Sequence, residues 1–255
     1  MHLAARHWIF ASVVCLLSAT SSLAEDNKLT FKQRLARGDP AAQYLEAALS
    51  DNDEESFAWL RKSAEQGYAP AQASLGYRYH SGKGVGKDYV QAVGWLRKAD
   101  EQDNADAQYL LGSCYYYGNG LSTDLVEAMT YYRKAAEKGH IAGQFRLGCC
   151  LERGEGTPKD FIEAAIWYRK AAEQGLAEAQ YNLGNCYADG KGVPKDKIEA
   201  YAYQNLAGVT VEVARINLSR LETEMTQEQI AAGQNRTKEL QEEIKKKKEA
   251  KKAKK

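Results

Sequence analysis

Two adjacent cysteines, Cys149 and Cys150, have side chains that could take part in chemistry. They lie in the stretch QFRLGCCLERGEG. Thiols can form a redox centre, bind a metal ion or join in a disulfide. Buried cysteines can also act as small apolar packing residues. Cys114 and Cys186 lie 36 residues to either side of Cys150, so these three form one column of a repeated pattern.

The spacing of this cysteine column argues against disulfides along it. Stacked helices lie about 8–10 Å apart, whereas a disulfide needs α-carbons within about 7 Å. We therefore interpret Cys114, Cys150 and Cys186 as buried packing residues. Cys149 falls one position earlier, in a column expected to be more open, so it is predicted to be the more reactive thiol of the adjacent pair.

Other residues that could do chemistry form no known site. Beyond residue 24 the only histidines are His80 and His140, which lack cysteines at zinc spacing and are expected at the surface. The acidic run DNDEES resembles a calcium loop, but Ser56 and Lys62 stand where that loop needs glycine and glutamate. Serine acyl-transfer motifs are absent, and the glycine-rich segments lack phosphate-loop spacing. We predict no catalytic residue, no metal and no cofactor.

The elements that position these residues follow a period of 36 residues. Leu-Gly pairs recur with this step, two glycines follow each pair, and an aspartate and an aromatic residue come next. The pairs begin at Leu75, Leu111, Leu147 and Leu183; the aspartates are Asp88, Asp124, Asp160 and Asp196; the aromatic residues are Trp59, Trp95, Tyr131, Trp167 and Tyr203. So many columns in register indicate a structural repeat.

Each repeat is predicted to be a pair of antiparallel helices. In the first helix, Ala179, Leu183 and Tyr187 share one apolar stripe, and Gly184 leaves room for a neighbouring helix. In the second helix, Asp160 with Glu163 has capping-box spacing. One such hairpin cannot bury its apolar stripe alone, so the repeats must stack.

The segments AEAQYNLGNCYADGKGVPKDKIEA and WYRKAAEQG closely resemble the Sel-1-like repeat, a relative of the tetratricopeptide repeat. The resemblance implies an all-α, right-handed superhelix with four full repeats over 69–210 and a shortened repeat over 40–68. A half-repeat cap is expected over 25–39 and capping helices over 211–244, the last beginning at Thr226 with Gln229 completing its capping box. Some secreted relatives bridge the two helices of a repeat by a disulfide, but here the second helices contain no cysteine.

The resemblance also implies that the first helices line a concave face that binds a protein or peptide. Its residues would form an aromatic strip with polar groups, a composition suited to such a partner. They are Tyr77, His80, Tyr109, Tyr116, Tyr117, Phe145, Cys149, Arg153, Tyr181 and Asn185. Tyr109, Phe145 and Tyr181 share a column and could equally be structural, whereas Tyr77, Tyr116, Tyr117 and Arg153 depart from their columns.

The two ends of the chain differ from the repeats. Residues 1–24 have a basic start, an apolar run too short to span a bilayer, and small residues up to Ala24, which predicts a cleaved signal peptide. An uncleaved anchor or a buried helix is the alternative. We expect export to the periplasm or beyond the cell.

The last segment, 245–255, holds eight lysines and one glutamate and is predicted to be a basic disordered tail. The net charge of the chain is +1; with Arg6 in the leader, residues 25–244 therefore carry −7. The alternative for Lys245–Lys255 is electrostatic contact with an anionic surface. Nucleic acid is not expected, because no aromatic residues are interleaved for base stacking.

These observations predict an exported, non-enzymatic scaffold that binds a protein or peptide segment as an adaptor in complex assembly or signalling. Two alternatives remain open. One is a β-lactamase or penicillin-binding-like envelope enzyme, since some secreted relatives have been linked to that activity. The other is an envelope-attached structural protein that uses the lysine tail.

Overall fold

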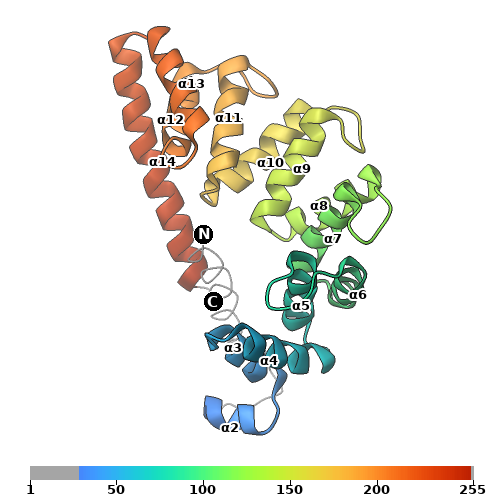
Figure 1. The fold of residues 1–255 in the computed structure, drawn as a ribbon. Coiled ribbons are helices and arrows are strands. Elements are labelled where there is room, and N and C mark those ends of the chain that lie inside the picture. Colours follow the sequence, from blue (N-terminus) through green and yellow to red (C-terminus); the bar gives the residue numbers. More distant parts are fainter. Residues whose placement is uncertain (1–28, 254–255) are drawn as a thin grey trace. The chain divides into compact units, whose positions relative to one another are not determined.

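The computed structural model describes residues 29–253, and the predicted signal peptide lies outside this range. Within it, all thirteen regular elements are α-helices, which confirms the all-α prediction. The helices form two compact units that meet in sequence between Thr123 and Asp124. Figure 1 shows their order along the chain.

The first unit holds a short N-terminal helix followed by helices that pack in sequence order. Its elements are α2 (Phe31–Ala36), α3 (Pro40–Leu49), α4 (Asp53–Glu65), α5 (Ala69–Ser81), α6 (Tyr89–Asp100) and α7 (Ala105–Tyr117). The helices α3 with α4 and α5 with α6 form the closest pairs. Tyr44, Leu60 and Leu75 are buried together between α3, α4 and α5, and they form part of the core of this unit.

The second unit continues the helical hairpins and ends in two helices outside the repeats. Its elements are α8 (Leu125–Glu137), α9 (Ile141–Arg153), α10 (Phe161–Glu173), α11 (Ala177–Asp189), α12 (Lys197–Ala207), α13 (Glu212–Thr223) and α14 (Gln227–Ala253). Each of α9 and α11 packs on its own second helix and on the second helix before it. The long helix α14 runs along α12 and reaches α10 (Figure 1).

The predicted capping boxes form only in part. Asp160 accepts a hydrogen bond from the Glu163 amide at 2.8 Å, as expected at a helix start. The Glu163 carboxylate, however, accepts from Arg133 of α8 and from Trp167 Nε1 rather than capping in return. An ion pair between neighbouring repeats thus takes the place of the reciprocal cap. The Thr226–Gln229 box at the start of α14 is complete, as predicted.

Two kinds of glycine let the helices approach closely. Gly184 lies against Gln204 of α12, where an added Cβ would stand 3.1 Å from that side chain, as the sequence predicts for a glycine inside the helix. Gly192 closes the next loop with φ +73°. A Cβ there would overlap the carbonyl oxygen of Phe161 in the preceding repeat. The second glycine of the loop is therefore required both by its backbone conformation and by the packing of adjacent repeats.

A ladder of side-chain amides links successive repeats. Gln174 Nε2 donates to the Gly139 carbonyl at 3.2 Å and to Gln144 Oε1 at 2.8 Å. Gln144 Nε2 in turn donates to the Ala136 carbonyl at 3.2 Å. Gln102 and Gln72 make the corresponding bonds in the first unit. These bonds satisfy buried polar groups where one hairpin meets the next.

The basic C-terminal segment differs from the prediction. A disordered tail from 245 is wrong for residues 245–253, because α14 continues through them. Lysine is a good helix former, so charge alone does not unfold such a segment. Lys247 Nζ lies 2.8 Å from Glu173 Oε2, and Lys251 Nζ lies 3.0 Å from Gln174 Oε1. These contacts hold the segment against the C-terminal end of α10.

Candidate functional site

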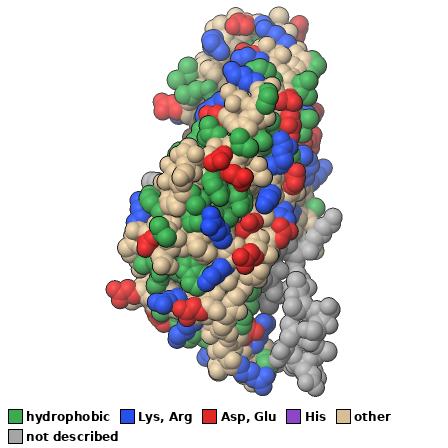
Figure 2. Space-filling model, turned by 90° about the vertical axis from the view of Figure 1, so that its right-hand side faces the viewer, with side chains coloured by type: hydrophobic (Ala, Val, Ile, Leu, Met, Phe, Trp, Pro, Cys, Tyr) green, Lys and Arg blue, Asp and Glu red, His purple; other side chains and the backbone are tan. Residues whose placement is uncertain are grey.

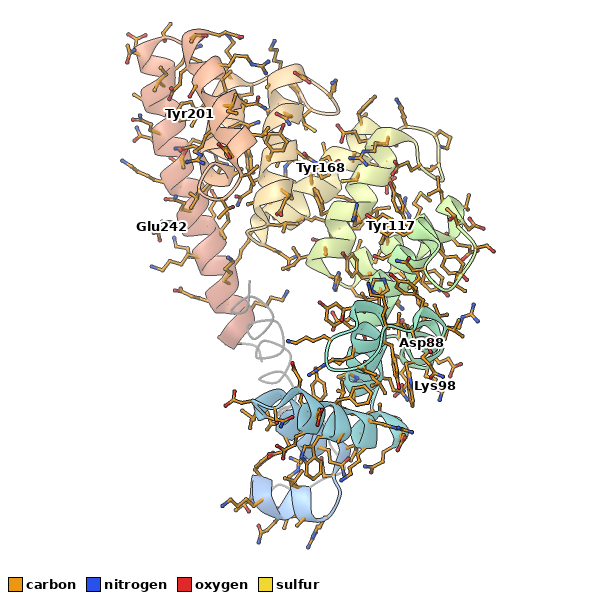
Figure 3. All side chains as sticks on the ribbon, in the orientation of Figure 1. Asp88, Lys98, Tyr117, Tyr168, Tyr201 and Glu242 are labelled. Carbon is orange, nitrogen blue, oxygen red and sulfur yellow. The ribbon has the colours of Figure 1, made fainter. Side chains whose placement is uncertain are left out.

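In the first unit, the first helices α5 and α7 present the most open of the predicted aromatic residues. Tyr77 is 48% exposed and Tyr117 is 53% exposed, although both are large side chains with an apolar ring. Tyr116 packs edge-on against Tyr117, with ring centroids 4.8 Å apart. Figure 3 labels Tyr117. Tyr109, from the column that could be structural, is half-buried on the same helix.

His80 is half-buried rather than a surface residue. Its Nε2 atom lies 3.2 Å from Asn119 Nδ2, and its ring packs edge-on against Tyr89 at 5.2 Å between centroids. Burial, with the charge of Lys87 as a smaller cause, lowers the pKa of His80. A neutral ring held in this way can take part in hydrogen bonds at neutral pH and carries no charge.

His140 is also not at the surface, since it is 8% exposed. It is the N-cap of α9, and its Nδ1 atom accepts a hydrogen bond from the Gly143 amide at 3.0 Å. A capping role normally taken by Ser, Thr, Asp or Asn is therefore filled by an imidazole nitrogen.

Cys149 is buried, so the expectation of an open position is wrong. It is 6% exposed, and burial raises the pKa of its thiol. The side chain of Tyr168, from α10, lies beside it and donates a hydrogen bond to Glu152 at 2.7 Å. The sequence shows the column but not the tyrosine that crosses from the second helix to cover it.

Tyr181 and Asn185, the predicted residues at the C-terminal end of the strip, are contacted by other helices of the same chain. Asn217 of α13 donates to Asn185 Oδ1 at 3.2 Å and lies 3.5 Å from the Tyr181 hydroxyl. Gln204 of α12 also donates to Asn185, at 2.7 Å. Tyr181 and Asn185 therefore help to dock the capping helix.

The remaining two predicted residues of the second unit differ from each other. Phe145 is half-buried and packs against Tyr168, with ring centroids 6.0 Å apart. Arg153 is exposed, and its Nη1 atom lies 3.8 Å from Glu155 Oε1. The ten predicted residues thus fall five to each unit, and Tyr77, Tyr117 and Arg153 are the exposed ones.

A column of lysines over aromatic rings was not predicted. In four of the five repeats the lysine three positions after the aromatic residue lies over that ring, as Lys170 does over Trp167 at 3.7 Å from the centroid. The others are Lys62 over Trp59, Lys98 over Trp95 and Lys134 over Tyr131. The recurring Arg-Lys dipeptide after the aromatic column is the sequence signal that could have indicated it.

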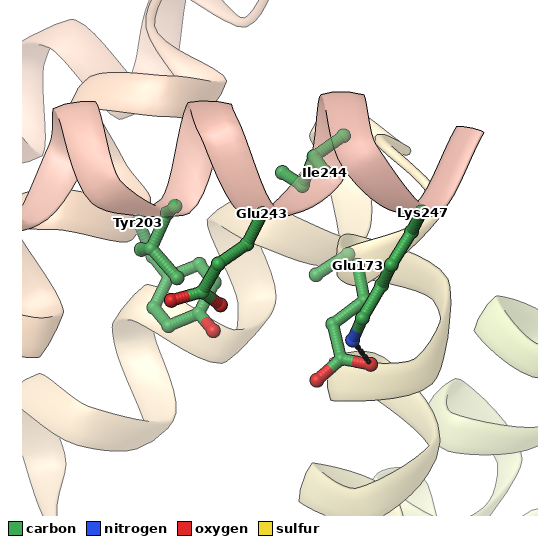
Figure 4. A pocket seen from close by; sticks show the side chains of 7 residues that line it. Glu173, Tyr203, Glu243, Ile244 and Lys247 are labelled. Carbon is green, nitrogen blue, oxygen red and sulfur yellow. Dashed lines mark hydrogen bonds and ion pairs between the residues drawn. The ribbon is translucent and has the colours of Figure 1, made fainter. Parts of the chain in front are cut away.

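The described residues offer little for metal or small-molecule chemistry. Across 29–253, no group of three His, Cys, Asp or Glu side chains could hold a metal ion. A cavity of about 10 Å³ lies between α14 and the helices α10 and α12, lined in part by Tyr203, Ile244 and Lys247 (Figure 4). Such a volume has room for about one water molecule.

Charged side chains of both signs are scattered over the face shown in Figure 2, with hydrophobic side chains between them. This face carries no broad field of positive charge of the kind that nucleic-acid binding uses. Among residues 29–253, no helix is both long enough and apolar enough to cross a membrane.

Comparisons with known proteins agree with this architecture. The family model described as Sel1 repeat matches residues 41–68, 69–104, 105–140, 141–176 and 177–207. No curated protein matches the chain significantly.

Two solved structures are similar in both sequence and fold. One is c5321, a protective antigen of uropathogenic Escherichia coli that displays an SLR fold, with 35% identity and a TM-score of 0.77 over 84% of this chain and 48% of that one. The other is a Sel1 repeat protein from Oxalobacter formigenes, with 34% identity and a TM-score of 0.69 over 75% of this chain and 57% of that one. The chain thus spans about half the length of these two relatives.

Five matched repeats, the two-helix units and these structural relatives together show that the chain belongs to the Sel1 repeat family, whose members generally serve as protein–protein interaction scaffolds.

Proposed function

We propose that this protein binds a segment of a partner protein through the first-helix face of its first unit. The observation that carries the proposal is the exposure of Tyr77 on α5 and Tyr117 on α7, the first helices of consecutive repeats. A large side chain with a ring and a hydroxyl contributes much contact area for little loss of rotamer freedom. Tyrosine is accordingly enriched at the energetic centres of interfaces.

The surrounding residues suit a peptide rather than a charged small molecule. Tyr116 packs against Tyr117 and widens the aromatic surface, while His80 and Asn119 add neutral hydrogen-bonding groups. An extended segment could lay apolar side chains on the rings and satisfy its backbone groups with these polar atoms. The second unit contributes less, because Cys149 is buried and Asn185 is already hydrogen-bonded to α12 and α13.

We further propose that the protein acts after export, as an adaptor in the periplasm or outside the cell. The leader-like residues 1–24 support this location. The E. coli relative is a protective antigen, which fits an exported protein.

A pull-down from envelope extract tests the binding face. The double variant Tyr77→Ala/Tyr117→Ala should lose the partner recovered with the unaltered protein, because it removes both exposed rings. Val90→Ala is the matched control, since Val90 is 73% exposed on α6, a second helix of the same unit. Circular dichroism should show the same helix content in all three proteins. An identical set of bound proteins for the double variant would disprove the face assignment.

A further inference from the structure

The outer face of α13 carries exposed apolar side chains. Val209, just before the helix, is 80% exposed, Val213 is 48% exposed and Ile216 is 63% exposed. Within the helix, the three-residue spacing of Val213 and Ile216 places these two side chains on one face, as an apolar stripe. The terminal element of a repeat array ordinarily presents a polar outer face, because no further repeat covers it. This stripe departs from that rule.

The helix α13 takes the place of the first helix of a further repeat. Ala214 and Leu218 repeat the four-residue spacing of Ala179 and Leu183 in α11. As a first helix does, α13 packs on the preceding second helix, α12, and Asn217 reaches the preceding first helix through Asn185. These contacts with α12 and α11 cover the buried side of α13.

In α11 the position equivalent to Ile216 is held by Tyr181, so the exposed stripe lies on the face that the first helices leave open. The neighbouring side of α11, which packs on its second helix, holds Gly184, directly after Leu183 and against Gln204 of α12. Ser219 follows Leu218 in the same way and is exposed. The helix that follows, α14, packs along α12 and α10 instead of forming a close hairpin with α13. Within the described chain, nothing replaces the missing second helix.

We propose that a second copy of this chain covers the stripe, with the two α13 helices antiparallel about a two-fold axis at Ile216. The charges support a self-complementary pairing. Glu212 and Arg220 are both exposed and lie four residues to either side of Ile216. The two-fold axis therefore places Glu212 of one copy beside Arg220 of the other, twice in each dimer.

The same pairing suits the apolar residues. Ile216 meets its own counterpart on the axis, and Val213 of one copy faces Ser219 of the other. Among residues 29–253, neither Glu212 nor Arg220 takes part in an ion pair, so both remain available. The contact area of one helix per copy is small, so the dimer forms reversibly as concentration rises. The pairing is independent of the tyrosine face on α5 and α7.

Sedimentation velocity of the full chain over a concentration series tests the pairing. The unaltered protein should shift from monomer toward twice the monomer mass. Ile216→Asp should stay monomeric, because it places two carboxylates on the axis. Glu212→Lys and Arg220→Glu should each weaken the dimer at least about tenfold, because like charges then face each other.

Two further samples make the test specific to this antiparallel geometry. The double variant Glu212→Lys/Arg220→Glu should regain the dimer, because the pairs reform with their signs exchanged. An equimolar mixture of the two single variants should form a heterodimer for the same reason. Glu242→Lys is the matched control: Glu242 is exposed on α14 (Figure 3), and its reversal should leave the mass unchanged.

Circular dichroism of each variant separates loss of pairing from loss of fold, and every substituted side chain is exposed. The proposal is overturned if the unaltered chain remains monomeric at every concentration. It is also overturned if Ile216→Asp still dimerises, or if neither the double variant nor the mixture recovers the dimer. Association of monomeric chain with a different protein through α13 would likewise overturn it.

Discussion

The four cysteines of the described chain act at the scale of single residues as packing groups. Cys114, Cys149, Cys150 and Cys186 are all free and buried. Burial raises the pKa of Cys114 and Cys186 to about 11 and that of Cys150 to about 12. A thiol protonated in this way is a poor nucleophile and a poor metal ligand. Both cysteines of GCC are therefore packing residues, as predicted for Cys150 but not for Cys149, which was expected to be the more reactive thiol.

Thiol labelling of the native protein checks this conclusion. At pH 7.5 an aromatic disulfide reagent should modify none of these four cysteines quickly, and labelling should proceed only as the protein unfolds. In denaturant all four should react. Tyr77→Cys provides a positive control, because that position is 48% exposed and should label at once. Rapid modification of Cys149 in the native state would contradict the packing role.

The same thiols set a direction for the pH dependence of stability. Their pKa values in the folded protein lie above the ordinary value of 9.0, so the unfolded chain loses these protons first as pH rises. Their stabilising contribution is complete below pH 9 and is lost as pH rises from about 9 to about 11. Cys114→Ala should reduce that loss, which urea unfolding at several pH values can measure.

At the scale of elements, α14 shows that the charge pattern of a segment does not determine whether the segment is helical or disordered. Lysine-rich composition suggested disorder, but the helix persists because its first half is anchored by packing. Leu240 is 3% exposed against the repeats, and Arg236 Nε lies 2.7 Å from Glu199 Oε1 on α12. The lysine end adds Lys247 with Glu173, both substantially exposed. The two halves should therefore contribute very differently to stability.

Leu240→Ala should lower the free energy of unfolding by about 2–4 kcal/mol, because it opens a cavity beneath α14. Lys247→Ala should lower it by less than about 0.5 kcal/mol, since exposed ion pairs contribute little. Urea unfolding followed by circular dichroism measures both, and a constant m-value supports a two-state comparison. Equal losses would mean that charge rather than packing holds the helix.

The helices inside the repeats were predictable because each repeat supplies the same local signals. The capping aspartate Asp160 and the close-packing Gly184 act within a few residues or within one hairpin, so their roles follow from spacing alone. The Glu163–Arg133 pair joins neighbouring repeats, and the sequence assigned Glu163 to its nearer capping role instead. Contacts between repeats depend on how hairpins stack, which the spacing does not specify.

At the scale of the whole molecule, the candidate site was predictable as a set of columns but not as an open surface. Tyr77 and Tyr117 are exposed as the departures from pattern suggested. Asn185 lies in the column of Tyr77, and Tyr181 lies in that of Tyr109 and Phe145, yet α13 docks on both. The position of α13 depends on residues outside the repeat period, so the sequence of the repeats could not indicate that one end is covered.

The uneven charge of the molecule leads to a prediction for the basic C-terminal segment. Residues 25–244 carry −7, whereas 245–255 carry eight lysines and one glutamate. Lys247 and Lys251 contact α10, but Lys245 and Lys246 are exposed on α14. Each lysine close to an anionic bilayer contributes about 1 kcal/mol of attraction, and salt screens it within about 10 Å at 0.1 M.

The envelope-attachment role for 245–255 therefore predicts binding to vesicles that contain phosphatidylglycerol at low ionic strength. Binding should fall steeply with added salt and be absent from vesicles of phosphatidylcholine alone. Deletion of 245–255 should abolish it while the partner recovered through Tyr77 and Tyr117 is retained, because Lys247 and Lys251 contact Glu173 and Gln174 and neither tyrosine. Co-sedimentation measures the binding to vesicles, and the envelope pull-down measures the recovery of the partner. Vesicle binding that survives the deletion would assign the attraction to another surface of the protein. If the unaltered protein fails to bind vesicles at low salt, the role left for these lysines is their contact with the C-terminal end of α10.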